Sequence, residues 1–227
     1  MKFIVLLLVL MAGCSLIITN NWQPAKLQKG IDNLAVIKTT LTLGDRTLTH
    51  KAVAIPIDEG ILALSHATLP LIVEVIQSPF GRLVRYIKPD SYFYSVDGKR
   101  IRLIGRAGDI SLFERKTKKR FPFALGDSDK VKIGDRVVVL GYSFTKIFNI
   151  KDGIVSSLKT PQESRLSNCF LLTVPINPGD SGSPVLAWQD NELKVVAIVN
   201  AMIKDHGMSF AIKINEVKKR IKKIQNL

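Results

Sequence analysis

Short apolar segments separated by turn residues are the feature that most restricts how this chain folds. Each segment has strand length and is rich in Val, Ile, Leu and Thr. The pair Asp97-Gly98, between two of these segments, is typical of a tight hairpin turn. Strands are expected at Ala35–Leu43, Thr47–Ile57, Ile61–Ser65, Leu71–Gln77, Leu83–Ile87, Tyr92–Val96, Ile101–Ile104, Arg136–Gly141, Gly153–Leu158, Cys169–Val174, Pro184–Trp188 and Leu193–Val199. Many short strands at fairly even spacing predict an all-β chain built as barrels or as a sandwich.

A helix is expected only at the end of the chain, where Val217, Ile221 and Ile224 share one face among many lysines. The composition of the 227 residues, 46% hydrophobic and 23% charged, is that of a globular protein. Two cysteines exclude a disulfide-rich scaffold and a Cys-based zinc cluster. Three histidines leave little room for a His-rich site, so we expect no metal and no other cofactor.

Residues 1–14, MKFIVLLLVLMAGC, have the form of an export signal. Lys2 precedes an apolar run from Phe3 to Ala12 that is too short to cross a bilayer as a helix. The ending Ala-Gly-Cys resembles the bacterial lipoprotein signal, which implies cleavage after residue 13 and a lipid on Cys14. The alternatives are an ordinary signal peptide and an uncleaved anchor. The lipoprotein interpretation predicts an exported cell-envelope protein, lipid-anchored at the periplasmic face or cell surface.

The stretch Pro178–Val185, PGDSGSPV, carries the clearest sign of chemistry. A serine between glycines requires a tight turn that exposes the hydroxyl and lets backbone N–H groups approach a carbonyl that becomes negative during acyl transfer. A plain turn of small polar residues is the alternative for a shorter motif. The whole stretch resembles the nucleophile loop of the chymotrypsin-like (trypsin-like) serine peptidases. Flanking segments resemble the HtrA/Deg branch of that family: LGDSDKVKIGDRVVVLG, DGIVSSL and VAIVNAMIKDHGMSFAI.

The resemblance implies an all-β fold of two six-stranded antiparallel β-barrels of the chymotrypsin-like type, followed by a C-terminal α-helix. The expected division is a signal peptide over residues 1–13, a tether over 14–30, an N-terminal barrel over 31–120, a C-terminal barrel over 121–212 and a basic helix over 213–227. The seam falls near a basic stretch, Arg115–Arg120. No PDZ domain of the kind HtrA proteins usually carry is expected after the helix.

The resemblance also implies a catalytic triad in family order. The segment ILALSHA ends an apolar strand with His66, similar to the strand that carries the family's base, and GDISLF begins a strand after Asp109, similar to the segment with the acid. With Ser181 as nucleophile, His66 accepts its proton and Asp109 orients the imidazole. The backbone N–H groups of Gly179 and Ser181 are expected to form the oxyanion hole.

The histidines and Asp180 leave alternatives open. A histidine that closes an apolar strand is more often structural, and His50 and His206 compete with His66 for a catalytic role. Asp180 occupies a position that is often Asn in the HtrA branch. It is Asp in digestive relatives, where it pairs with an amino terminus created by cleavage. A lipidated amino terminus does not serve that role, so Asp180 either has another partner or stays hydrated.

The substrate pocket is expected beside the nucleophile. The resemblance places its floor around residues 173–176 and its walls on two later strands. The expected pocket residues are Pro175, Asn200, Ala201, Ser209, Phe210 and Ala211. Because no acid occurs in the floor segment, selection of Arg or Lys is not expected, and a small or medium apolar side chain before the cut is favoured.

The net charge of +14 is concentrated in Arg115–Arg120 and in the tail. Such runs are either solvated faces or contacts to an anionic membrane, and nucleic acid is least favoured because no aromatic residues are interleaved. The sequence therefore predicts a membrane-tethered serine endopeptidase acting on protein or peptide substrates. The alternative is a catalytically inactive lipoprotein of the same fold that binds peptides or protein partners, and the oligomeric state stays open.

Overall fold

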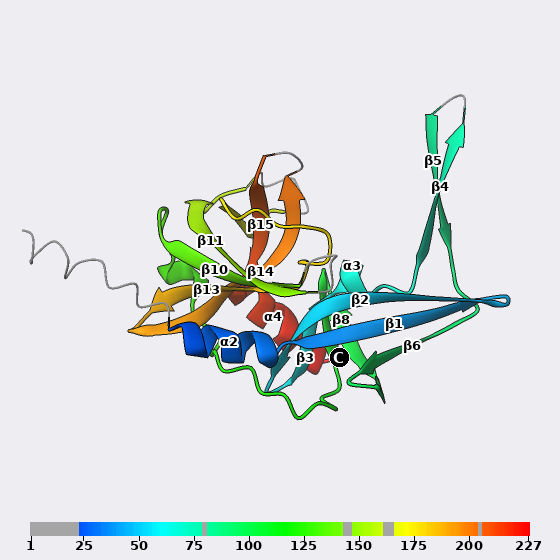
Figure 1. Ribbon diagram of the computed structural model, residues 1–227, viewed down its shortest axis with the longest axis horizontal. Helices are drawn as coiled ribbons and strands as arrows, with labels where there is room; N and C mark the ends of the chain where they lie inside the picture. Colours follow the sequence, from blue (N-terminus) through cyan, green and yellow to red (C-terminus); the bar gives the residue numbers. More distant parts are fainter. Residues whose placement is uncertain (1–22, 79–80, 143–146, 161–165, 204–205) are drawn as a thin grey trace, which may run out of the picture.

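A computed structural model describes residues 23–227 except 79–80, 143–146, 161–165 and 204–205, and it describes no side chains within residues 72–83. Strands make up most of it and form two units joined by an extended segment (Figure 1). The expected export signal and Cys14 lie outside the described residues.

The N-terminal unit is a seven-stranded antiparallel sheet in the order β7-β6-β1-β2-β3-β9-β8. Two further strands, β4 and β5, pair with each other in a separate hairpin that stands away from the sheet (Figure 1). The turn at Asp97-Gly98 joins β6 to β7 as the sequence predicts. The elements are α2 (Pro24–Asp32), β1 (Ala35–Leu43), β2 (Arg46–Ile57), β3 (Gly60–Leu64), α3 (Ser65–Thr68), β4 (Ile72–Ser78), β5 (Gly81–Ile87), β6 (Ser91–Val96), β7 (Lys99–Ile101), β8 (Leu103–Ala107) and β9 (Ile110–Phe113).

The C-terminal unit is a closed six-stranded barrel in the order β10-β11-β12-β15-β14-β13. All its pairings are antiparallel, and irregular register shifts bend β11, β13 and β14. The elements are a 3₁₀ turn η1 (Ser128–Lys130), β10 (Arg136–Tyr142), β11 (Phe148–Ser157), β12 (Cys169–Leu172), β13 (Pro184–Gln189), β14 (Glu192–Ile203), β15 (Met208–Lys213) and α4 (Ile214–Gln225).

The predicted all-β, two-unit architecture with a C-terminal helix is confirmed. The N-terminal unit differs in detail, because its sheet has seven strands and, over the described residues, its order does not close on itself. The hairpin explains part of this difference. β4 and β5 pair only with each other among the described strands, so they neither extend nor close the main sheet.

The buried apolar side chains form three clusters, because successive side chains of a strand point to opposite faces. In β10, Val137 and Val139 face the interior of the barrel, whereas Val138 and Leu140 face the other unit. In the same way, Leu62 on β3 faces the barrel while its neighbours face the interior of the N-terminal sheet. Because side chains alternate between the two faces of a strand, an uninterrupted apolar segment is what a strand buried on both faces requires.

Residues 24–30 of the expected tether belong to a packed helix. Proline at the start of α2 suits a first helical turn, and Leu27, Gly30 and Ile31 form its buried face. A Cβ on Gly30 would lie 2.6 Å from the ring of Phe123 and 2.7 Å from Leu140, so the helix lies close against the barrel. The sequence pattern did not indicate α2 because its apolar residues are few. Residues 24–30 are therefore part of the folded unit.

Helix α4 packs between the two units. Its buried residues are Ile214, Val217, Ile221 and Ile224, the face that the sequence predicts. The helix contacts β8 and β9 of the N-terminal sheet and β14 and β15 of the barrel. Across the stretches that the structure describes, no helix combines the length and apolarity needed to cross a membrane.

Candidate active site

His66 and Asp109 are joined at the end of the N-terminal sheet. β3 ends at Leu64, and the chain turns at once into α3, which carries His66. Asp109 occupies the turn between β8 and β9, next to β3. His66 Nδ1 lies 2.7 Å from Asp109 Oδ2, and the backbone N–H of His66 donates to Asp109 Oδ1 at 2.9 Å. Both oxygens of this carboxylate therefore orient one residue.

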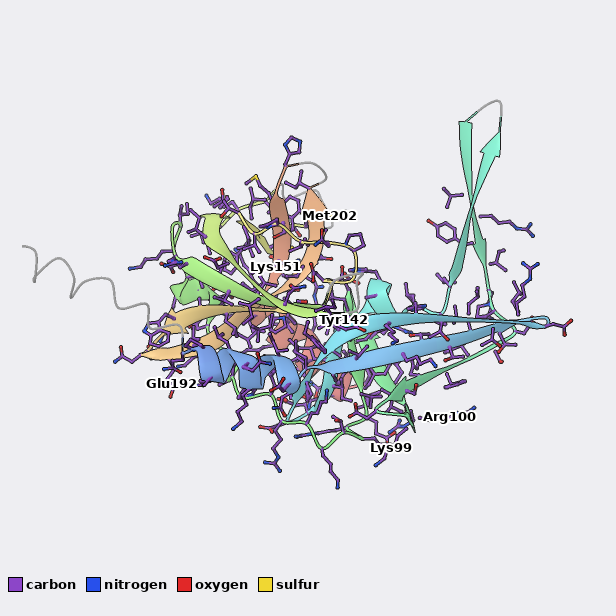
Figure 2. All side chains as sticks on the ribbon, viewed as in Figure 1. Lys99, Arg100, Tyr142, Lys151, Glu192 and Met202 are labelled. Carbon is purple, nitrogen blue, oxygen red and sulfur yellow. The ribbon has the colours of Figure 1, made fainter. Side chains whose placement is uncertain are left out.

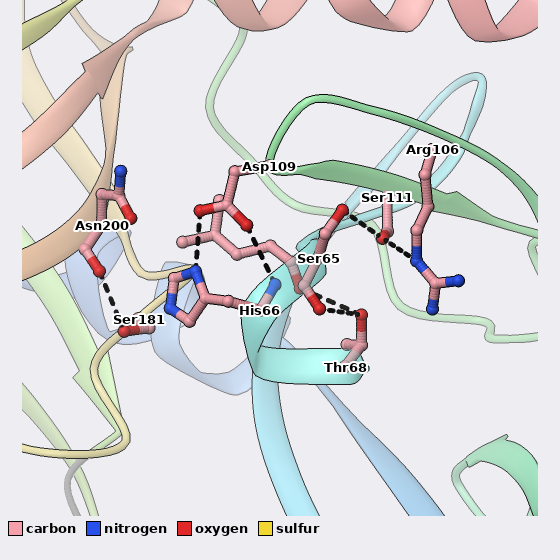
Figure 3. Close-up of polar contacts among 9 residues, drawn as sticks. Ser65, His66, Thr68, Arg106, Asp109, Ser111, Ser181 and Asn200 are labelled. Atoms are coloured by element: carbon pink, nitrogen blue, oxygen red, sulfur yellow. Dashed lines mark hydrogen bonds and ion pairs between the residues drawn. The ribbon is translucent and has the colours of Figure 1, made fainter. Parts of the chain in front are cut away.

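Hydrogen bonds behind this pair fix its geometry (Figure 3). The Ser65 N–H donates to the backbone carbonyl of Asp109 at 2.9 Å, and the hydroxyls of Ser65 and Ser111 lie 2.9 Å apart. Arg106 donates to Ser111 Oγ at 3.2 Å and to the hydroxyl of Tyr94 at 2.8 Å. Because Ser65 and Ser111 are buried, this network holds the α3 turn against β9.

Ser181 is presented by the barrel, in the turn before β13. Its hydroxyl donates to the backbone carbonyl of Asn200 on β14 at 3.2 Å. Figure 3 shows the imidazole of His66 between the carboxylate of Asp109 and the side chain of Ser181. Since Nδ1 faces Asp109, the free ring nitrogen Nε2 lies on the serine side. The structure thus brings the three predicted residues together from both units.

The backbone of the serine loop is tightly turned. The N–H of Asp180 donates to the Asn177 carbonyl at 3.0 Å, and the N–H of Ser183 donates to the Asp180 carbonyl at 2.9 Å. The backbone N–H groups of Gly179 and Ser181 have no hydrogen-bond acceptor among the described residues. Two such groups on one short turn are available to an outside acceptor, as the expected oxyanion hole requires.

A cavity of about 430 Å³ opens beside these residues. It is lined by His50, Lys51, Ala52, His66, Ala67, Leu69, Leu71, Pro178, Gly179 and Ser181. Burial lowers the pKa of His50 from its usual value, and a hydrogen bond to the backbone of Ala67 acts in the opposite direction. His50 and Lys51 were not predicted as wall residues, because strand pairing and not a local motif brings β2 to the site.

The six residues expected to form the substrate pocket do not line this cavity. Asn200 and Ala201 lie on β14 and the Ser209–Ala211 segment lies on β15, where Ala201 pairs with Phe210. Ala211 and Ser209 are buried, and Pro175 is exposed after β12. Their role as a pocket remains a prediction. His206 is exposed in the turn between β14 and β15, outside this cavity.

Asp180 has a partner that was not predicted from the sequence. The carboxylate is fully buried, and the ammonium of Lys151 on β11 contacts its Oδ2. The alternation of β11 in the sequence would turn Ile150 and Ile154 inward and Lys151 outward, whereas in the structure these isoleucines are 45% and 40% exposed. That pattern turns Lys151 to the opposite face of the strand from these isoleucines.

The described residues contain no group of three or more His, Cys, Asp or Glu side chains arranged to hold a metal ion. The groups that the site itself offers for chemistry are the serine hydroxyl, the imidazole, the carboxylate and the backbone N–H groups.

Residues 81–198, just over half of the chain, match the family described as the trypsin-like peptidase domain. The chain belongs to the trypsin-like peptidase family. The matched segment of this trypsin-like peptidase includes Asp109 and Ser181 and begins after His66.

This trypsin-like peptidase is similar to HtrA-like serine proteases. A relative from Staphylococcus epidermidis is 32% identical over 119 residues, covering 46% of this chain and 20% of the relative. One from Staphylococcus aureus is 31% identical over 113 residues, covering 45% of this chain and 15% of the relative. The match spans a fifth or less of the length of these two relatives.

Solved structures of an HtrA-type protease share the fold. The HtrA-type protease AlgW with a tripeptide has a TM-score of 0.61 and 20% identity, covering 87% of this chain and 63% of that chain. A variant of AlgW with a decapeptide has a TM-score of 0.64 and 16% identity, covering 88% and 67%. The HtrA-branch, chymotrypsin-like fold expected from the sequence is therefore confirmed.

Proposed function

We propose that this protein is a serine endopeptidase that cleaves peptide bonds through Ser181, His66 and Asp109 with an acyl-enzyme intermediate. The observation that carries the proposal is the bond between His66 and Asp109, which leaves the other ring nitrogen facing the serine. Ser181 and His66 also line one cavity, so a substrate carbonyl that enters it meets nucleophile and base together.

The reaction begins when the Ser181 hydroxyl rotates from the Asn200 carbonyl toward Nε2 of His66. Its oxygen attacks the peptide carbonyl as Nε2 takes the proton, and Asp109 stabilises the imidazolium that forms. The N–H groups of Gly179 and Ser181 bind the negative oxygen. His66 returns the proton to the leaving amine as the C–N bond breaks. Water then repeats these steps on the acyl-enzyme and frees Ser181.

The substrate class follows from the same strands. We infer that the substrate pocket begins on β14, next to Ala201 and the paired Phe210, and the hydrogen bond from Ser181 to the Asn200 carbonyl supports this. Because residues 173–176 contain no acid, cleavage after a small or medium apolar side chain is expected. Mass spectrometry of the products from unfolded casein tests this expectation, and predominant cleavage after Arg or Lys would contradict it.

Labelling with a fluorophosphonate probe tests the catalytic assignment. Wild type is expected to be labelled at Ser181 and to degrade unfolded casein, whereas Ser181→Ala does neither. The matched control is Ser91→Ala, which changes an exposed serine on β6 and should leave both properties unchanged. A wild-type protein that binds peptides without being labelled would instead support the inactive, peptide-binding alternative.

We also infer that the protein is held at a membrane by a lipid on Cys14. The motif at residues 1–14 supports this, and the basic run Arg115–Arg120, whose residues are exposed or half-buried, suits an anionic lipid surface. Metabolic labelling with an alkyne fatty acid should modify wild type and not Cys14→Ser. Equal recovery of the two proteins in the membrane fraction would contradict the lipid anchor.

A further inference from the structure

A buried ion pair lies directly behind the nucleophile. Asp180 precedes Ser181 and its side chain has no exposed surface, while the Lys151 side chain is 15% exposed. Figure 2 labels Lys151 on the C-terminal barrel. Asp180 Oδ2 contacts the ammonium of Lys151 and accepts a hydrogen bond from the Asn177 N–H at 2.7 Å. Within the described part of the chain, Oδ1 has no hydrogen-bond donor, so compensation of the buried charge falls on Lys151 and one N–H group.

The same carboxylate closes the turn formed by residues 177–181, which we call the oxyanion loop. Asp180 receives the Asn177 N–H through its side chain and donates its own N–H to the Asn177 carbonyl, so the two residues are bonded in both directions. Gly179 lies inside this closed turn and Ser181 follows it directly. A displacement of the Asp180 carboxylate therefore moves the two N–H groups proposed to bind the oxyanion.

The cation comes from a rigid element. Lys151 lies in the middle of β11, where it pairs with Val139 of β10, and β11 also pairs with β12 in the closed barrel. Lys151 shares one face of β11 with Gly153 and Val155, the latter in the barrel core. The ammonium is thus positioned by the fold itself and does not depend on a chain terminus.

We propose that Lys151 is a positioning residue that holds the oxyanion loop in its working conformation through Asp180. The inference rests on the proposed endopeptidase function. It assigns to an internal lysine the role that an amino terminus released by cleavage has in digestive relatives. The site is accordingly assembled on folding, without a proteolytic activation step.

Four proteins and one control test this role. Lys151→Met leaves the Asp180 carboxylate buried without its cation, and we expect the rate of fluorophosphonate labelling and kcat to fall by about 100-fold, with KM changed by less than about threefold. The labelling rates of Asp180→Asn and of the double variant Lys151→Met/Asp180→Asn are compared. The double variant removes both charges and keeps a side-chain oxygen that accepts from the Asn177 N–H. The double variant is expected to label at least about tenfold faster than Lys151→Met, because no unpaired charge remains. The control is Lys132→Met, an exposed lysine of the same unit, which should react like wild type.

The outcomes separate this inference from the function on which it rests. A folded Lys151→Met protein that reacts at the wild-type rate overturns the role of Lys151 and leaves the endopeptidase intact. If Lys151→Met does not fold, the double variant decides, and a folded double variant more than about tenfold slower than Asp180→Asn shows that Lys151 does not act through Asp180 and overturns the proposal. A wild-type protein that is not labelled overturns the proposed function, and this inference with it.

Discussion

Gly182 directly follows the oxyanion loop and lies against the N-terminal sheet. Its replacement by alanine should lower the free energy of unfolding and slow the reaction of Ser181. The residue has φ of +95°, and a Cβ built on it would lie 2.5 Å from the backbone carbonyl oxygen of Val53 on β2. Its N–H donates to the Val199 carbonyl at 2.9 Å, so the backbone is held from the other side as well. Neither neighbour is the flexible end of a side chain, and the new methyl group has no room to move away.

Two costs add in Gly182→Ala. An alanine in the left-handed region costs about 1–2 kcal/mol. The contact with Val53 adds about 1–3 kcal/mol, as expected when an extra carbon is forced into packed structure. Gly134→Ala isolates the first cost, because Gly134 has φ of +90° and a Cβ on it would meet nothing within 4 Å. The free energy of unfolding should therefore fall by about 2–5 kcal/mol in Gly182→Ala and by about 1–2 kcal/mol in Gly134→Ala.

Urea unfolding followed by tryptophan fluorescence measures both losses, and fluorophosphonate labelling below the transition reports on the loop. The Gly182→Ala protein should also be labelled more slowly than wild type, since Ser181 is the adjacent residue. Gly134→Ala should be labelled at the wild-type rate. If the two variants lose equal free energy and label equally fast, the close approach of Gly182 to Val53 does not constrain the site.

Three further predictions concern Asp109, Cys169 and His50. Asp109→Asn should lower kcat by about 10⁴-fold, because an amide N–H facing Nδ1 favours the wrong tautomer of His66; an unchanged kcat in steady-state assays would exclude that role. Cys169 is 2% exposed and burial raises the pKa of its thiol, so mass spectrometry should find it unmodified by iodoacetamide until the protein unfolds. The pKa of His50 is lower in the folded protein than the usual 6.5, so the unfolded chain binds the proton more readily and stability should fall as the pH drops below about 6.5. Urea titrations across that range should show a smaller fall for His50→Gln.

Much of this fold can be predicted from the sequence, because the strands are recognisable from short apolar segments and from the turn residues between them. β3 is buried along its whole length and reads as an uninterrupted apolar segment, and the Asp97-Gly98 turn indicates the hairpin it closes. The order of His66, Asp109 and Ser181 carried enough family pattern to select the residues that the structure brings together at the candidate site.

What the sequence did not reveal depends on pairing between distant segments. His50 lines the cavity because β2 pairs with β1 and β3, and no motif near His50 in the sequence indicates this pairing. Lys151 and Asp180 are separated along the chain and meet only when the barrel closes. The openness of the N-terminal sheet is likewise a property of which strands pair, since the pattern of each strand alone is compatible with a barrel.

The candidate site also depends on packing that lies well outside it. His66 and Asp109 belong to the N-terminal sheet and Ser181 to the barrel, so their spacing is set by how the two units pack. That interface is built from one face of β2, β3 and β9, one face of β10, and the apolar face of α4. A Cβ on Gly105 of β8 would lie 2.8 Å from Ile224, so the last turn of α4 lies close against the sheet that carries the imidazole. Because packed interiors transmit small displacements, the apolar face of the basic helix α4 helps to fix the distance between His66 and Ser181.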